Sequence, residues 1–492
     1  MKHTQALLCA AGIGIMTIFS CKKDSKTPTP TTTTKTDTLS KRYLPGWWSV
    51  QNYNYTSVYF GADSFFYQSI PQQAEQTGKW WWSGTDSIQV RITGRNSLSV
   101  NDSAGFTLIW TVSRLRSDSL YLIPGAGSNT VTCSRKDSAG FTSPVLTTLA
   151  GSYFAGGAGD NGPAVTAQLN QPADVALDKA GNIFIADYGN TLIRKITVST
   201  GVISTVAGQF SGPYSDMDSM PATGTLIGSP YGVAFDRNGD FYIADFFIDV
   251  LRKVSVSSGI MTIIAGDATV TSTSSSVQPG YYGDSLPGRK TKLRGPLKLA
   301  VDTAGNVYFC DGSNYRVRRL DRASGLVVNV AGTGVSTYNG DGIAATTAAL
   351  YYPNGLAIDK NGNIFVADYN RIRRIDAHTG LISTVAGTGT AGFSGDGGQA
   401  TAAQINSISG VAVDGSGNIY FCDAGNNRIR KISAADGTIS TIAGNGIAGF
   451  SGDGMHATAM RLNQPTGIAT DAAGNVYFAE FKNNRVRKLT FQ

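Results

Sequence analysis

Six copies of one pattern of apolar and polar positions fill the C-terminal two-thirds of the chain. Each copy has an apolar strand, an Asp, a turn with Gly, an aromatic-rich strand and a second acid: 175–187, 233–245, 299–311, 356–368, 411–423 and 468–480. The first Asp recurs after 58, 66, 57, 55 and 57 residues, and the second acid follows it by nine residues. A long fixed period predicts a repeat architecture in which each unit buries its apolar faces against its neighbours.

Each copy contains four short strand-like runs separated by Gly and Asn turns, which in the first copy are 174–178, 182–187, 192–198 and 202–208. Even spacing of short strands predicts four-stranded antiparallel sheets, and six such sheets arranged radially make an all-β, six-bladed β-propeller. The last copy lacks its fourth run, and a matching run occurs at 145–151, before the first copy. We therefore predict that this N-terminal run completes the sixth blade and closes the ring.

These residues resemble the NHL-repeat family over about 145–492, through GFSGDGGQAT (392–401), NGLAIDKNGNIFVAD (354–368) and NNRIRKI (426–432). The resemblance implies a six-bladed NHL-type β-propeller. Propellers of this family include RNA-binding domains, extracellular ligand sensors and peptide-amidating lyases, so the fold alone does not fix the function.

The segment 41–138 does not repeat, contains all six Trp residues and shows the alternation typical of strands. Its runs GWWSV, FGADSFFY, GKWWWSGTDSIQV and WTVSRLRSDSLYL resemble small bacterial lipocalin-like domains. That resemblance implies a small β-barrel that binds a small apolar ligand. The alternative is that the Trp residues pack a compact core. We expect this domain to be a spacer or a second binding module.

The start of the chain carries a targeting signal. Residues 1–20 have a basic start and a short apolar run, and they resemble a bacterial lipoprotein signal peptide that ends at Cys21. Residues 21–40, rich in Thr and Pro, predict a disordered tether behind the lipidated Cys21. An ordinary signal peptide is the alternative. We expect a lipid-anchored, monomeric protein of the bacterial cell envelope, at the periplasmic or the surface side of the outer membrane.

The predicted location affects which partner the net charge indicates. The net charge is +7, but an extracytoplasmic location disfavours nucleic acid and favours anionic polymers of the cell surface. Arg and Lys recur in the third strand of every copy, where we expect the stems to cover apolar blade edges and the heads to meet acids or water. Cys310 and Cys422 stand where other copies have Ala, which predicts small buried core residues, and Cys133 has no evident partner.

One aligned Asp lies in each loop between blades, twelve residues before the next blade opens: Asp160, Asp218, Asp284, Asp341, Asp396 and Asp453. We expect these loops on one face, around the channel mouth. In four copies an aromatic residue stands three positions earlier, which suits a sugar. A Ca²⁺ ion shared between loops is another hypothesis. The structural alternative is Asx-turns that satisfy local backbone N–H groups.

The positions where the copies disagree are better candidates for a specific site. Four copies place Gly near the start of the innermost strand, whereas the first has Asp174 and the third has Lys298. Tyr231 and Asn354 lie one position earlier in their own copies. Such an asymmetric polar set at the channel mouth predicts a ligand site. The alternative is an ion pair that plugs the channel.

We therefore expect a binding protein that presents a propeller face to a glycan, peptide or protein, with no catalytic residue, metal site or cofactor assigned. The other hypotheses are a lactonase-like hydrolase or lyase with its site at the channel mouth, and a purely structural envelope scaffold. A three-His metal site is not expected, because only His378 and His456 lie beyond the signal. The sequence leaves open whether the 267–295 loop covers the mouth.

Overall fold

The fold was analysed in a computed structural model of the chain. It describes the backbone of eight strands between 46 and 135, and residues 144–491 apart from 153, 211–217, 268–279 and 454–455. The signal, Cys21, the tether and residues 268–279 of the 267–295 loop lie outside the described residues. The chain divides into two compact units, one reaching to 142 and one beginning at 143, with a few residues near 453 assigned to the first.

The first unit contains a closed antiparallel barrel in which each strand pairs with the next and the last pairs with the first. Its strands are β1 (Gly46–Ser49), β2 (Ser57–Phe60), β3 (Phe65–Ser69), β4 (Gln76–Trp82), β5 (Ser87–Ile92), β6 (Phe106–Leu115), β7 (Ser119–Pro124) and β8 (Val131–Arg135). The all-β prediction for this segment agrees with the barrel. The lipocalin-like resemblance stays a prediction.

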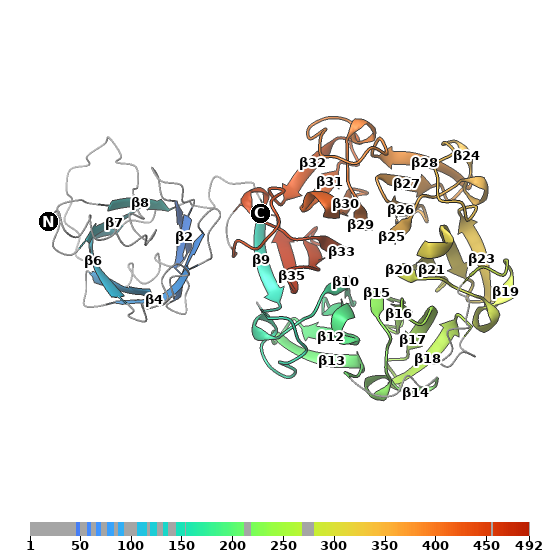
Figure 1. The fold of residues 1–492 in the computed structure, drawn as a ribbon, viewed down its shortest axis with the longest axis horizontal. Coiled ribbons are helices and arrows are strands. Elements are labelled where there is room, and N and C mark those ends of the chain that lie inside the picture. The colour runs from blue at the N-terminus through green and yellow to red at the C-terminus, as the bar shows by residue number, and fades with distance from the viewer. Residues whose placement is uncertain are drawn as a thin grey trace, which may run out of the picture. The chain divides into compact units, whose positions relative to one another are not determined.

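The second unit is a ring of six antiparallel sheets around a central channel, as predicted from the repeat (Figure 1). Blade 1 has β10 (Pro172–Leu177), β11 (Ile183–Asp187), β12 (Leu192–Thr197) and β13 (Val202–Gly208). Blade 2 has β15 (Pro230–Phe235), β16 (Phe241–Asp245), β17 (Val250–Val254) and β18 (Ile260–Ala265). Blade 3 has β20 (Pro296–Val301), β21 (Val307–Asp311), β22 (Arg316–Leu320) and β23 (Leu326–Ala331). In each blade the first strand is innermost.

The remaining blades repeat this order. Blade 4 has β25 (Pro353–Ile358), β26 (Ile364–Asp368), β27 (Arg371–Ile375) and β28 (Leu381–Ala386). Blade 5 has β29 (Ile408–Val413), β30 (Ile419–Asp423), β31 (Arg428–Ile432) and β32 (Ile439–Ala443). Blade 6 has β33 (Pro465–Thr470), β34 (Val476–Glu480) and β35 (Arg485–Thr490), and its fourth strand is β9 (Val145–Ala150). Because β9 pairs with β35 from Val145 to Ala150, the predicted closure by the N-terminal run is confirmed.

The segment that enters each blade first runs along its outer edge and then crosses to the innermost strand. Three of these segments add a short fifth strand: β14 (Met220–Pro221), β19 (Leu286–Pro287) and β24 (Ile343–Ala344). Each also forms a 3₁₀ turn: η2 (Ala164–Thr166), η4 (Ala222–Gly224), η5 (Gly288–Lys290), η7 (Ala345–Thr347), η8 (Ala400–Ala402) and η10 (Ala457–Ala459). Ala400 accepts a hydrogen bond from Gly387 of blade 4 and donates one to Gly437 of blade 5. These turns therefore fasten neighbouring blades together.

Apolar side chains from the inner strands fill the space between blades. Phe184 and Ala186 of blade 1 share one cluster with Phe241 and Ile243 of blade 2. This packing explains why the first two strands of each copy are apolar on both faces.

A buried ion pair links the second and third strands of every blade. Its acid is the second acid of the repeat, and its partner is an Arg whose side chain is at most 2% exposed. The nearest N–O distances are 3.6 Å (Arg194–Asp187), 3.1 Å (Arg252–Asp245), 3.3 Å (Arg318–Asp311), 4.0 Å (Arg373–Asp368), 3.5 Å (Arg430–Asp423) and 2.9 Å (Arg487–Glu480). The guanidinium groups of these Arg residues are buried against acids, whereas the sequence analysis expected them to meet either acids or water.

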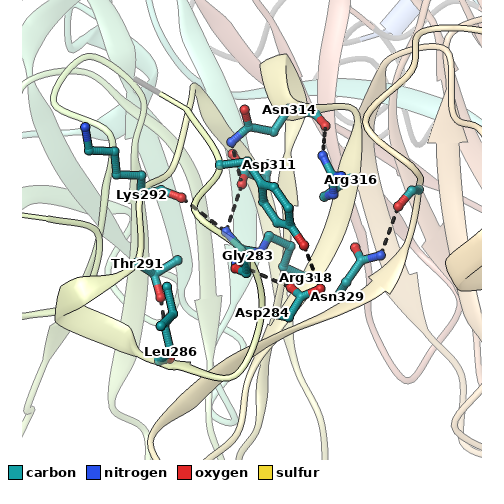
Figure 2. Close-up of polar contacts among 12 residues, drawn as sticks. Gly283, Asp284, Leu286, Thr291, Lys292, Asp311, Asn314, Arg316, Arg318 and Asn329 are labelled. Atoms are coloured by element: carbon teal, nitrogen blue, oxygen red, sulfur yellow. Dashed lines mark hydrogen bonds and ion pairs between the residues drawn. The ribbon is translucent and has the colours of Figure 1, made fainter. Parts of the chain in front are cut away.

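The same acid holds the segment that enters the blade. In blade 3, Asp311 accepts a hydrogen bond from the Asn314 side chain (2.9 Å) and pairs with Arg318 (Figure 2). It also accepts a hydrogen bond from the Arg294 backbone N–H (2.8 Å). The tight turn η6 (Gly312–Asn314) delivers Asn314 to the acid, as η3 (Tyr188–Asn190) and η9 (Ala424–Asn426) do in blades 1 and 5. One carboxylate therefore fixes three separate parts of a blade.

We predict that Arg373→Ala lowers the free energy of unfolding by about 3–5 kcal/mol, because it leaves the buried carboxylate of Asp368 without its cation. Arg374, the next residue in β27, is the matched control. Its pair with Asp376 is 37% and 30% exposed, so Arg374→Ala should cost at most about 1 kcal/mol. Urea unfolding of both variants measures the difference, and equal effects would contradict a central role for the buried pairs.

The buried acids also predict a pH dependence. Burial raises the pKa of Asp187 to about 7 and the pKa values of Asp311, Asp368 and Asp423 to about 6. In the unfolded chain these groups titrate near pH 3.9, so the folded state takes up more protons between about pH 7 and pH 4. The free energy of unfolding should rise as the pH falls from 8 to 5.5. Melting at the two pH values tests this, and a lower midpoint at pH 5.5 would refute it.

Candidate functional site

The innermost strands approach one another most closely near their first residues. A Cβ atom at Gly232 would lie 2.5 Å from the Leu297 carbonyl O, and one at Gly410 would lie 2.4 Å from the Thr466 carbonyl O. A Cβ atom at Gly467 would meet the backbone of Asp174 at 2.4 Å. The Gly residues shared by four copies are therefore required by the narrow channel.

The two copies without Gly fill the channel at this level. Lys298 Nζ lies 2.9 Å from Asp174 Oδ1, and the two residues are 4% and 6% exposed. The register shifts near the first residues of all six innermost strands, as between Pro172 and Asp174 in β10 and between Pro296 and Leu299 in β20. The two charged groups therefore pair with each other at this narrow level of the channel.

Backbone groups of other blades also form hydrogen bonds with these two side chains. The Val233 N–H donates to Asp174 Oδ2 (3.1 Å), and Lys298 Nζ donates to the Ala173 carbonyl O. Burial raises the pKa of Asp174 and lowers that of Lys298, because leaving water disfavours both charged forms. Their mutual attraction opposes both shifts.

Tyr231 and Asn354 lie beside this pair, so the structure brings together all four predicted ligand-binding residues. Lys298 Nζ is 5.1 Å from the centre of the Tyr231 ring. Burial raises the pKa of Tyr231, which keeps its hydroxyl protonated at neutral pH. Asn354 Oδ1 is buried and has no hydrogen-bond partner among the described residues.

An arc of aromatic rings surrounds these residues at the same end of the channel. The ring of Tyr188 lies 5.8 Å from that of Tyr231 and 5.9 Å from that of Phe481, and Tyr231 lies 5.8 Å from Phe246. We call these four residues the aromatic mouth. They come from blades 6, 1 and 2, and all are partly exposed.

Sequence analysis missed three of these rings, although the repeat contains a signal for them. Tyr188, Phe246 and Phe481 each follow the second acid directly, and Tyr369 does so in blade 4. The other two copies have Gly312 and Ala424 at this position. Comparing the copies at this position would have revealed an asymmetric aromatic set.

Four of the six aligned loop Asp residues contact the third strand of a blade, two strands away from the innermost one. Their partners are buried Arg residues at 2.7 Å (Asp160–Arg194), 3.6 Å (Asp284–Arg318), 2.9 Å (Asp341–Arg373) and 2.7 Å (Asp396–Arg430). Asp218 instead accepts from the Ile263 N–H (2.7 Å) and pairs with Arg289, and Asp453 also has a partner. These contacts hold the loops against the blades.

The aromatic residues that precede these Asp residues are also engaged. The Arg428 guanidinium lies 3.7 Å from the Phe393 ring centre, and Arg316, Arg371 and Arg485 contact Tyr281, Tyr338 and Phe450 in the same way. One face of each ring is therefore covered by the protein. The sugar site suggested at these loops stays a hypothesis.

Cys310 and Cys422 are buried free thiols, in agreement with their predicted role as small core residues. Burial raises the pKa of both thiols, which makes them poor nucleophiles. Within the described part of the chain, no three His, Cys, Asp or Glu side chains gather as metal ligands. No described helix is long and apolar enough to cross a bilayer.

Comparison with known proteins gives two family matches. The NHL repeat model matches residues 169–196, and the teneurin NHL domain model matches residues 333–394. Among curated proteins, SUPPRESSOR OF QUENCHING 1 of Arabidopsis thaliana is 28% identical over 50% of this chain and 23% of its own length. Mouse teneurin-1 is 28% identical over 44% of this chain and 8% of its own length. The chain thus spans less than a quarter of these relatives.

Two solved structures from Bacteroides thetaiotaomicron share the fold. A structural genomics protein of unknown function has 17% identity and a TM-score of 0.52, and the match covers 86% of this chain and 99% of that one. An auxiliary nutrient binding protein has 14% identity and a TM-score of 0.53, with 87% and 93% covered. The chain is thus a six-bladed β-propeller in which residues 169–196 match the NHL repeat model.

Proposed function

We propose that this protein is a non-enzymatic binding protein whose propeller holds a glycan at the aromatic mouth. In this proposal, lipidation of Cys21 anchors it outside the cytoplasm, where cell-surface and nutrient glycans are available. The observation that carries the proposal is the arc of partly exposed rings above a buried ion pair whose two charges cancel.

The chemistry of the mouth suits a sugar better than a charged ligand. Sugar C–H faces pack on aromatic rings, and sugar hydroxyl groups need hydrogen-bond partners. Tyr188 and Phe481 supply partly exposed rings, and the buried Asn354 Oδ1 beside them accepts no hydrogen bond from a described residue. The charges of Asp174 and Lys298 are already paired, so the floor of the mouth offers no free charge to an ionic ligand.

The structural neighbour described as an auxiliary nutrient binding protein is compatible with this role. At 14% identity its likeness extends to the fold alone, so the proposal depends on the mouth residues of this chain.

We predict that Tyr188→Ala and Phe481→Ala each weaken glycan binding about tenfold, because loss of one ring contact costs on the order of 1 kcal/mol. Binding partners would be found on an array of envelope and plant oligosaccharides with the full chain, and affinities measured by calorimetry. Tyr282→Ala is the control, since this ring is 64% exposed and lies outside the aromatic mouth.

Two results would contradict the proposal. One is the absence of binding to any oligosaccharide. The other is oligosaccharide binding that survives removal of both rings. Selective binding of peptides at the mouth would replace the glycan with a protein ligand.

A further inference from the structure

A cavity lies on the other side of the Asp174–Lys298 pair from the aromatic mouth. Its volume is about 390 Å³, and it is lined by the innermost strands of all six blades from the level of the pair to their last residues, such as Leu177 and Thr470. The cavity therefore has one end closed by a buried ion pair. Apart from Asp174 and Lys298, which form the floor of the aromatic mouth, its lining lies outside the proposed glycan site.

The walls carry polar backbone groups as well as apolar side chains. Each innermost strand is the terminal strand of its sheet, so only one of its edges is paired. At the level of the ion pair, side chains form hydrogen bonds with backbone groups on the unpaired edges. The Ser409 hydroxyl, for example, donates to the Pro465 carbonyl O (2.8 Å). Along the cavity, the contact from Thr470 Oγ1 to the Val413 carbonyl O (3.5 Å) is the one such bond among the described residues. The inward edges of these strands pair with no other strand in the described part of the chain.

Lys298 supplies a further donor at the closed end. Its ammonium group has three N–H bonds, and the described residues offer two acceptors, Asp174 Oδ1 and the Ala173 carbonyl O. The residue is 4% exposed and lines the cavity. A buried donor without an acceptor is costly, so the third N–H favours an oxygen atom from an occupant of the cavity.

The space is provided by Ala at the middle of every innermost strand. These residues are Ala176, Ala234, Ala300, Ala357, Ala412 and Ala469, and all of them line the cavity. At roughly 30 Å³ for each water-sized group, the volume holds about a dozen such groups, which is the size of one sugar ring with its hydroxyls.

We propose that this cavity is a second binding site, for a small neutral polyol about the size of a monosaccharide. An alkyl ligand is disfavoured, because it would strip water from the free backbone groups without replacing their hydrogen bonds, at a greater cost per group than a methylene gains by burial. A charged ligand is disfavoured because Asp174 and Lys298 already neutralise each other, so it would bury a net charge. A polyol satisfies the wall groups and Lys298 together.

The test uses the full chain with myo-inositol and D-glucose as probes and hexan-1-ol as the apolar comparison, by ligand-observed NMR and calorimetry. Saturable polyol binding is expected. Ala357→Leu should weaken polyol binding at least tenfold by filling the cavity. If that variant does not fold, Ala176→Leu in blade 1 tests the same effect. The double variant Asp174→Asn/Lys298→Met should also weaken it without leaving an unpaired charge.

Tyr188→Ala separates this proposal from the glycan proposal, since it removes a ring of the mouth and leaves the cavity intact. It should not change polyol binding. Oligosaccharides are too large for the cavity, so their binding at the mouth should survive Ala357→Leu. The proposal is overturned if neither polyol binds, if hexan-1-ol binds in preference, or if folded cavity variants bind polyols as the wild type does.

Discussion

The buried pair between the second acid of each repeat and an Arg of the third strand is the interaction on which the rest of the propeller depends. In blade 3, Asp311 binds Arg318, the turn residue Asn314 and the backbone of the entering segment at Arg294. A charge buried at this depth is tolerated only when it is fully partnered, so these contacts form together. They fix where each entering segment ends and where the innermost strand begins.

The position of the innermost strands then decides what the channel can hold. The strands converge until Gly is required at residues 232, 410 and 467, and the two exceptions bring opposite charges into contact. This pair divides the axis into two chemically different ends. One carries partly exposed aromatic rings, and the other carries small side chains and unpaired backbone edges. The two proposed sites follow from this division.

Features present in every copy hold the ring together, whereas features that differ between copies define the candidate sites. The loop Asp residues recur in every copy, and four of them pair with the buried Arg of a third strand, as Asp396 does with Arg430. Tyr188, Phe246 and Phe481 occur in some copies only, as do Asp174 and Lys298. A sixfold scaffold can bind an asymmetric ligand specifically only through such differences.

The sequence by itself determined the six blades and the closing strand at 145–150, and it placed Asp174 and Lys298 at equivalent positions near the channel. These follow from a strict period, because equivalent positions of a closed ring face the same axis. Only the tertiary structure decided that Asp160 binds Arg194, that Phe481 reaches Tyr188, and that a cavity remains beyond the ion pair. Such contacts depend on how closely neighbouring blades pack and on how loops cross them, which the spacing of residues along the chain does not encode.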